Sequence, residues 1–298
     1  MLESVQIKRA DYMNAWVSST RPKTLILSVI PFFIGTVFAI PHTNRINWVL
    51  MLFAMVSALS IQIATNFIND VFDFKKKADK ATRLGPKRGI HSGILTSSQV
   101  YLAALGFFAI ALLFGIPLII KGGLPICLIL LISVACGYLY TGGPKPLAYN
   151  GLGEVFVLIF FGLVSTAAAF YFQTGYVDFQ ILLVGFELGA LATLPIAINN
   201  LRDIKDDTLA NKKTLAVRFG KKFARCEITA LAFLPFILNF YFENVALTFT
   251  PWLTLPLTLS ITRHIWKTEP NETYNIFLGQ SVLLYALFSI SLCIGFLL

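Results

Sequence analysis

Continuous apolar segments, each about twenty residues long, recur along the chain, and this is the length that a helix needs to cross the hydrocarbon core of a bilayer. Only 13 % of the 298 residues are charged, whereas hydrophobic residues make up 56 %. Soluble domains carry about 25 % charged residues. A membrane β-barrel would instead show alternating apolar and polar residues. We therefore predict an all-α integral membrane protein, a bundle of nine transmembrane helices near residues 24–40, 48–67, 99–120, 124–141, 152–172, 179–198, 226–242, 245–262 and 276–298.

The Lys and Arg residues are distributed unevenly between the loops that join these predicted spans. If the N-terminus is cytoplasmic, all but two of the 24 Lys and Arg residues fall in cytoplasmic segments, and the exceptions are Arg45 and Lys121. Cytoplasmic loops of membrane proteins carry such an excess of positive charge. We therefore predict a cytoplasmic N-terminus and a C-terminus outside. The same bias accounts for the formal net charge of +9, so nucleic acid is not expected as a partner.

Two acidic clusters lie at the cytoplasmic ends of the second and sixth predicted spans, in a chain with only 15 acidic residues. In each cluster an Asn precedes an Asp by four residues, as Asn69 precedes Asp73 and Asn199 precedes Asp203. On a helix, this spacing places both side chains on one face. Carboxylate and amide oxygens suit Mg²⁺, which typically takes one or two carboxylates together with substrate phosphates. We expect the two faces to meet and to hold divalent metal against a phosphorylated ligand.

The two clusters differ in the residues that follow them. The second continues with Asp207, another four residues along, whereas the first has Lys77 at the matching position. Asp79 could replace that acid if the helix ends near Lys77, and Asp70 pairs with Asn66 on a neighbouring face. Solvated helix ends are the alternative explanation, because ionisable groups are cheaper there than at the bilayer midplane. Two matched faces, each followed by a basic loop, favour a metal site with the ligands Asn69, Asp70, Asp73, Asp79, Asn199, Asp203 and Asp207.

Basic residues surround both clusters, and an Arg can bind phosphate through two parallel hydrogen bonds. The positive-inside bias alone would explain their number but not their positions. Arg202 lies within the second acidic motif, and Arg88 lies within Gly85-Pro86-Lys87-Arg88. Arg21 and Lys23 open the first predicted span from the same side. The candidate diphosphate-binding residues are Arg21, Lys23, Arg88, Lys145 and Arg202.

Three tyrosines, Tyr138, Tyr140 and Tyr149, flank the segment 141–147. A belt of interfacial tyrosines is one explanation. The other is catalytic: an allylic carbocation forms when diphosphate leaves a prenyl chain, and an aromatic face stabilises a cation. Water would have to be excluded, because it would otherwise capture the cation. An electron-rich aromatic acceptor would then attack, with Asp73, Asp203 and Tyr140 as the predicted catalytic residues.

These residues resemble the motifs of the UbiA superfamily of intramembrane prenyltransferases. The Asn/Asp motifs are typical of the superfamily, and the runs 140–154 and 213–220 resemble its 1,4-dihydroxy-2-naphthoate polyprenyltransferase branch, the MenA type. Lys77 departs from the broad superfamily pattern but fits the MenA-type spacing, in which the acid comes two residues later, here Asp79. The other matching stretches are 21–25, 69–74, 85–88, 92–93 and 199–203.

The resemblance implies a reaction and a setting. A polyprenyl group would pass from polyprenyl diphosphate, held by Mg²⁺, to 1,4-dihydroxy-2-naphthoate, with loss of carbon dioxide and diphosphate, to give demethylmenaquinol for menaquinone biosynthesis. Residues 1–298 would form one transmembrane prenyltransferase domain in the lipid of the bacterial plasma membrane, with its active site toward the cytoplasm. Two alternatives stay open. The acceptor could be 4-hydroxybenzoate, homogentisate or another ring, or the chain could be a cation-coupled transporter, whose ion sites would be expected near the bilayer midplane.

Overall fold

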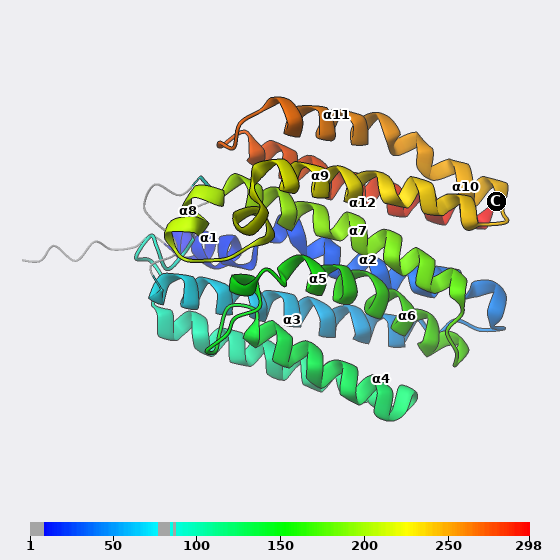
Figure 1. Cartoon of the computed structure of the whole chain (residues 1–298). Helices are drawn as coiled ribbons and strands as arrows, with labels where there is room; N and C mark the ends of the chain where they lie inside the picture. Colours follow the sequence, from blue (N-terminus) through cyan, green and yellow to red (C-terminus); the bar gives the residue numbers. More distant parts are fainter. Residues whose placement is uncertain (1–8, 77–83, 86–87) are drawn as a thin grey trace, which may run out of the picture.

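The chain folds into one elongated bundle of roughly parallel and antiparallel helices (Figure 1). A computed structural model describes residues 9–76, 84–85 and 88–298, and these residues contain no strand, so the predicted all-α class is confirmed. The helices are α1 (Arg9–Thr20), α2 (Pro22–Phe38), α3 (Trp48–Lys75), α4 (Ser97–Leu139), α5 (Gly153–Leu158), α6 (Ser165–Thr174), α7 (Phe179–Arg202), α8 (Ile204–Leu209), α9 (Leu215–Leu238), α10 (Val245–Phe249), α11 (Leu255–Lys267) and α12 (Tyr274–Leu297), with the short turns η1 (Ile40–His42), η2 (Ala148–Asn150), η3 (Ile159–Val164), η4 (Asn239–Tyr241) and η5 (Thr250–Thr254).

Seven helical segments of the described residues are long and apolar enough to cross a membrane, or eight if the bent pair α1–α2 is one span. Each apolar run predicted from the sequence overlaps one of these segments. Helix α4 has 43 residues and is interrupted at Gly123, whose φ of 68° and ψ of −154° are not helical. A Cβ on Gly137 would lie 3.3 Å from Phe108 Cε1, so the two halves of α4 lie side by side. The count of nine spans and the orientation of the termini stay predictions.

Helix α7 is the most enclosed of the long helices, since 83 % of its most apolar stretch is buried inside the bundle. Its side chains Leu188, Leu191 and Leu194 are completely buried and belong to a cluster that includes residues of α2, α9 and α12. Between membrane helices, close van der Waals packing rather than the hydrophobic effect supplies the attraction. The second acidic cluster therefore extends from the best-packed helix.

Glycines bring α7 into backbone contact with η3, a π-helical turn between α5 and α6. A Cβ on Gly162 would lie 2.3 Å from both Gly185 O and Gly189 Cα, so no side chain fits at this position. Small residues permit such close approach in membrane bundles. A π-helical turn also occurs frequently at functional sites, and residues of η3 line the cavity described below.

The first acidic cluster lies inside a helix. The Asn47 side chain caps the start of α3 by accepting a hydrogen bond from Leu50 N (3.1 Å), and the helix continues to Lys75. Asn69 and Asp73 are therefore one helical turn apart on one face, as their spacing predicts.

The second cluster crosses a helix end, so the four-residue spacing of Asn199, Asp203 and Asp207 does not place them on one continuous helix, as the spacing alone would suggest. Helix α7 ends at Arg202, and Asp203 has φ −92° and ψ 9° as the chain turns into α8. Backbone hydrogen bonds from Asp203 N to Asn199 O (3.0 Å) and from Asp207 N to Asp203 O (2.9 Å) keep the three residues about one turn apart. The three residues therefore stay close together although the helix ends between them.

Candidate active site

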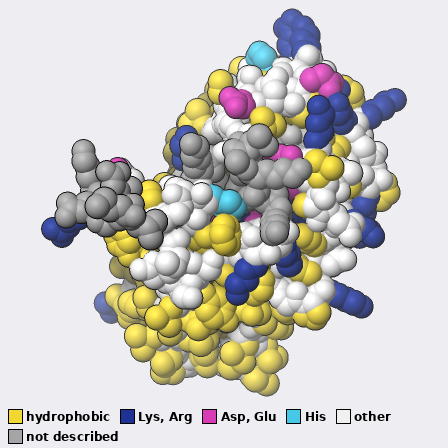
Figure 2. Space-filling model, turned by 90° about the vertical axis from the view of Figure 1, so that its left-hand side faces the viewer, with side chains coloured by type: hydrophobic (Ala, Val, Ile, Leu, Met, Phe, Trp, Pro, Cys, Tyr) yellow, Lys and Arg dark blue, Asp and Glu magenta, His cyan; other side chains and the backbone are white. Residues whose placement is uncertain are grey.

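A cavity of about 620 Å³ extends through the bundle from a polar end to an apolar end. Its lining residues on α3 run from Ala54 to Asp73, a length of about 28 Å along the helix axis. Figure 2 views the molecule from the end at which the acidic clusters lie: acidic side chains lie near the middle of this face, Lys and Arg are scattered around them, and apolar side chains predominate below. The apolar wall includes Leu118, Ile126, Ile129, Phe156, Phe160, Phe161 and Phe172.

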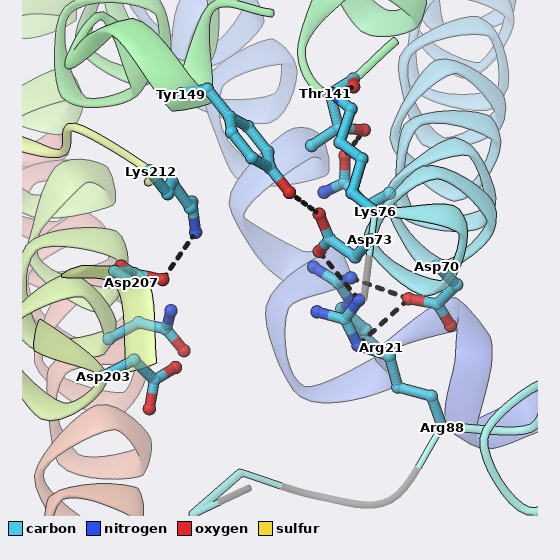
Figure 3. A network of polar contacts seen from close by, with 12 residues as sticks. Arg21, Asp70, Asp73, Lys76, Arg88, Thr141, Tyr149, Asp203, Asp207 and Lys212 are labelled. Atoms are coloured by element: carbon cyan, nitrogen blue, oxygen red, sulfur yellow. Dashed lines mark hydrogen bonds and ion pairs between the residues drawn. The ribbon is translucent and has the colours of Figure 1, made fainter. Parts of the chain in front are cut away.

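Asp70 holds two arginines at the polar end. Its side chain is completely buried, and Oδ1 lies 2.9 Å from Arg21 Nη2 and 3.2 Å from Arg88 Nε. Arg21 has a left-handed backbone (φ 57°) at the 45° bend between α1 and α2, a conformation uncommon for a residue with a side chain. The ion pair with Asp70 holds Arg21 at this bend, so both guanidinium groups lie beside the first cluster (Figure 3).

Asp73 is bound from two sides. Arg88 Nη1 lies 2.9 Å from Oδ2, and the Tyr149 hydroxyl donates to Oδ1 over 2.9 Å. Tyr149 comes from η2 and extends toward Asp73 from the loop after α4 (Figure 3). The Asp73 carboxylate is thereby oriented by a helix, a loop and an arginine that are distant in sequence.

Asn69 is held by the same loop. Thr141 Oγ1 donates to Asn69 Oδ1 (2.7 Å), and Lys76 Nζ donates to the Thr141 carbonyl (2.9 Å). Lys76 Nζ also lies 4.2 Å from the centre of the Tyr149 ring, a cation–π contact. Burial lowers the pKa of Lys76, although the negative charge of Asp73 opposes this effect. Lys76 therefore ties the end of α3 to the loop.

Arg202 organises the second cluster. Its side chain is 1 % exposed and pairs with both oxygens of Asp203, through Nε to Oδ1 and Nη2 to Oδ2 at 2.7 Å each. It also donates to Asn199 Oδ1 (2.7 Å) and to Asn275 Oδ1 of α12 (2.6 Å). This bidentate geometry is the strong form of an Arg–carboxylate pair.

Asp207 completes the second cluster from α8. Lys212 Nζ lies 3.4 Å from Oδ1, whereas Oδ2 is buried with no hydrogen-bond partner in the described residues. Burial raises the pKa of Asp207 to about 6; the Asp203 charge adds to this effect and Lys212 opposes it. The charge of Lys212 also acts on Asp73 of the first cluster. The two clusters therefore share one electrostatic environment, with Tyr149 between them (Figure 3).

Tyr140 lies where the polar end of the cavity meets the apolar wall. It lines the cavity, and its hydroxyl would lie 2.9 Å from a Cβ on Gly153, so glycine leaves room for the phenol. Burial, reinforced by the negative charge of Glu154, raises the pKa of the Tyr140 phenol, so it stays protonated and neutral. Glu154 in turn accepts a hydrogen bond from Asn200 Nδ2 (2.6 Å).

The acidic residues suit a metal that is shared with a ligand. No group of three or more His, Cys, Asp and Glu side chains among the described residues could hold an ion without further ligands. Within the two acidic clusters, the buried carboxylate oxygens Asp70 Oδ2 and Asp207 Oδ2 have no hydrogen-bond partner among the described residues. Mg²⁺ typically takes one or two protein carboxylates and completes its shell with phosphates and water. The donor set fits that arrangement.

Most of the sequence-predicted site residues come together. Asn69, Asp73, Asn199 and the three predicted arginines line the cavity, while Asp70, Asp203 and Asp207 bind residues that line it. Lys23 lines the cavity but is exposed, and Lys145 is exposed and does not line it. Asp79 and Lys77 lie outside the described residues, so the expected role of Asp79 is still a prediction.

The sequence did not indicate several of these contacts. In the sequence, Tyr149 is one of three tyrosines near the segment 141–147, and nothing singles it out as the partner of Asp73. Lys212 was one basic loop residue among many. Asn275 carried no signal at all, because it is one polar residue at the start of a span, 73 residues from Arg202.

The structure defines a helical membrane protein with a long apolar cavity, and Asn, Asp and Arg side chains lie together at one end of this cavity. The chain belongs to the UbiA prenyltransferase family, whose model matches residues 28–296. A relative from Haemophilus influenzae named 1,4-dihydroxy-2-naphthoate octaprenyltransferase is 30 % identical over 96 % of this chain and 97 % of its own. A protein of the same name from Bacillus subtilis is 35 % identical over 78 % of this chain and 75 % of its own.

Solved structures share the fold. A UbiA homolog from Archaeoglobus fulgidus, bound to GPP and Mg²⁺, superposes with a TM-score of 0.70 at 17 % identity and covers 95 % of this chain and 100 % of its own. The apo structure of a UbiA homolog from Aeropyrum pernix K1 gives 0.68 at 14 % identity, with 90 % and 96 % covered.

Proposed function

We propose that the protein transfers a polyprenyl group from polyprenyl diphosphate to 1,4-dihydroxy-2-naphthoate, with loss of carbon dioxide and diphosphate, to give demethylmenaquinol for menaquinone biosynthesis. The observation that carries the proposal is the continuity of one cavity between the Asn/Asp/Arg end and the apolar wall. An amphiphile with an anionic head and a long apolar tail matches both ends. The names of the relatives supply the acceptor.

The diphosphate head is assigned to the polar end. Arg21, Arg88 and Arg202 line the cavity there. Arg21 and Arg88 can bind phosphate oxygens through parallel hydrogen bonds, whereas Arg202, whose N–H groups already bind Asp203, Asn199 and Asn275, contributes chiefly its positive charge. Lys23 and Lys145, both exposed, are assigned supporting roles at the cytoplasmic entrance.

Mg²⁺ is the assigned cofactor. Asn69, Asp73, Asn199 and Asp203 are the proposed principal ligands, with Asp207 and Asp70 beside them, and Asp79 stays a candidate. When bound, the metal would neutralise negative charge that develops on the departing diphosphate.

The residues of the chain have defined tasks in the proposed reaction. The bond between the allylic carbon and the diphosphate oxygen breaks, and the oxygen keeps the electron pair. The ring of Tyr140 and the apolar wall hold the cation and exclude water. The acceptor ring then forms the new carbon–carbon bond at the carbon bearing the carboxylate. Carbon dioxide leaves that carbon, and the electrons of the broken bond restore the aromatic ring, so no nucleophilic side chain is needed.

The proposed setting is the bacterial plasma membrane, with a single prenyltransferase domain over residues 1–298. We assign nine spans by counting α1–α2 as one and dividing α4 at Gly123. The distribution of Lys and Arg supports a cytoplasmic N-terminus and a cytoplasmic active site. Both acidic clusters lie at one end of the bundle, which counts against a transporter with an ion site at the midplane.

The preference of the enzyme among aromatic acceptors is the decisive measurement. Purified protein in detergent, given Mg²⁺ and a polyprenyl diphosphate, should prenylate 1,4-dihydroxy-2-naphthoate in preference to 4-hydroxybenzoate and homogentisate. Preference for another ring would move the protein to a different prenyltransferase reaction. No product with any acceptor, under conditions in which a related enzyme works, would overturn the enzymatic proposal.

A further inference from the structure

Gln62 is a polar residue in the wall of the cavity whose hydrogen-bonding capacity is not met. It lies on α3 and lines the cavity, and its Oε1 is buried without a hydrogen-bond partner in the described chain. A carboxamide carries both an acceptor oxygen and two donor hydrogens. A buried polar group without a partner is unfavourable and calls for a physical explanation.

The position of Gln62 relates it to the proposed metal ligands. Residues 62, 66, 69 and 73 follow one another at steps of four, three and four, so they share one face of α3. Gln62 lies about 10 Å along the axis from Asn69, in the direction away from the polar end. Ile61 and Thr65 pack beside Gly137, so α3 and α4 approach each other closely at this depth.

The other polar side chains at this depth need no ligand. Thr65 Oγ1 donates to Ile61 O (2.8 Å), Ser133 Oγ to Ile129 O (2.7 Å), and Ser28 Oγ to Leu25 O (2.8 Å). Each hydroxyl is satisfied by a carbonyl of its own helix. Gln62 differs from these residues because its amide makes no such bond.

We propose that the Gln62 carboxamide binds a ring hydroxyl of the aromatic acceptor and so fixes which ring the enzyme accepts. The inference rests on the proposed function and names a residue that positions the acceptor within it. A phenolic hydroxyl both donates and accepts, so it can pair with either edge of an amide, and the last torsion of Gln has roughly two-fold preference. A polyprenyl tail has neither donor nor acceptor, so it cannot satisfy this group.

The distance of Gln62 from the polar end indicates which hydroxyl of the acceptor it would bind. The carbon that is prenylated must approach the allylic carbon, beside the diphosphate at Asn69 and Asp73. The far side of the two-ring acceptor then lies toward Gln62. The 4-hydroxyl, which is separated from the carboxylate-bearing carbon by one ring carbon, is the group assigned to the amide.

Gln62→Met tests the assignment, because methionine keeps the length of the side chain and removes both polar atoms. The KM for 1,4-dihydroxy-2-naphthoate should rise about three- to tenfold, the range expected for one hydrogen bond, while the KM for polyprenyl diphosphate stays within twofold. Gln280→Met is the matched control: Gln280 also has a buried unpartnered Oε1 in the described chain, but it lies on α12 and does not line the cavity. This control should change neither KM.

A substrate analogue separates binding from a general structural effect. In the unmodified protein, the inhibition constant of 1-hydroxy-2-naphthoate, which lacks the 4-hydroxyl, should be about three to ten times the KM for the full acceptor. In Gln62→Met the two should bind equally, because the partner of the hydroxyl is gone. An unchanged ratio, or a change confined to polyprenyl diphosphate, would overturn the inference.

The result for the unmodified protein keeps the two proposals distinguishable. If it turns over 1,4-dihydroxy-2-naphthoate and Gln62→Met behaves like Gln280→Met, the proposed function stands and the role of Gln62 is refuted. If it prefers another hydroxylated ring, the same comparison is made with that ring and its deoxy analogue. If it prenylates no aromatic acceptor, both proposals fail.

Discussion

Tyr149 donates a hydrogen bond to Asp73 over 2.9 Å although the two residues are 76 positions apart in the sequence. The contact joins η2 to α3, and Tyr149 lies between the two acidic clusters with Lys76 and Lys212 over its ring, at 4.2 and 6.0 Å from its centre. One aromatic side chain thus orients a carboxylate and holds two cations near it.

Tyr149→Phe separates these two tasks. The variant keeps the ring but loses the hydroxyl, so kcat should fall about tenfold, a barrier increase of about 1.4 kcal/mol, because Asp73 is no longer oriented. The thermal midpoint should fall by a few degrees, because a hydrogen bond to a charged group also stabilises the fold. Tyr149→Leu also loses the ring and should lower kcat and the thermal midpoint further. Steady-state rates and thermal unfolding in detergent measure the difference, and equal rates for the phenylalanine variant and the unmodified protein would contradict the role given to the hydroxyl.

Asp73→Ala and Asp203→Ala should each abolish turnover, because each removes a proposed metal ligand. Asp203→Ala should in addition lower stability by about 3 kcal/mol, since it leaves the buried charge of Arg202 without its carboxylate. Asp203→Asn keeps the size of the side chain and is the control for packing. Near-normal rates in either folded alanine variant would refute the metal assignment.

Arg202→Lys should be destabilising by about 1–3 kcal/mol and should raise the KM for polyprenyl diphosphate. An ammonium group cannot reproduce the planar bidentate pair with Asp203 while also reaching Asn199 and Asn275. Arg225→Lys offers a comparison, because Arg225 pairs with the exposed Glu269, and exposed ion pairs contribute only about 0–1 kcal/mol. Denaturant unfolding of both variants gives the two free-energy changes, and similar values would argue against the role of Arg202.

Mg²⁺ and an unreactive polyprenyl diphosphate analogue should bind cooperatively, because the described residues supply no site with three acidic or His/Cys ligands for the metal alone. Each should raise the affinity of the other by the same factor, expected at about tenfold or more. Calorimetric titrations in both orders measure this factor. Asp73→Asn should reduce it toward one, whereas undiminished coupling in that variant would exclude Asp73 from the shared site.

Lys121→Cys and Lys145→Cys test whether α4 crosses the membrane twice. In a background with the four natural cysteines replaced by alanine, a membrane-impermeant thiol reagent should label position 121 in intact cells and position 145 only after permeabilisation. Lys121 lies two residues before the interruption at Gly123, and Lys145 lies in the loop after α4 ends at Leu139, so the two positions flank the second half of this helix. Labelling of position 145 from outside would contradict the nine-span topology.

The sequence predicts most of the fold because membrane helices are determined locally, by length and hydrophobicity. The predicted runs 179–198 and 276–298 lie within four residues of α7 and α12, whereas α3 continues eight residues beyond the predicted end at residue 67. The spacing of Asn69 and Asp73 also sufficed to place them on one face, because helical periodicity is a local rule.

The contacts between elements were beyond such reasoning. The left-handed backbone of Arg21 is stabilised by Asp70, 49 residues away, and no local preference indicates it. The pair of Arg202 with Asn275 depends on how α7 packs against α12. The end of α7 at Arg202 cannot be predicted from the motif, because four-residue spacing alone does not show where a helix stops.

The glycine contact between η3 and α7 has a consequence for how the cavity can vary. Gly162 packs against Gly185 and Gly189, so the backbones of η3 and α7 cannot slide along one another at this point. The positions of Phe160 and Phe161 in the cavity wall are therefore fixed relative to Asn199 by main-chain contact. Side chains along the cavity wall can therefore be exchanged, which lengthens or narrows the cavity, while the distance between the two acidic clusters stays the same.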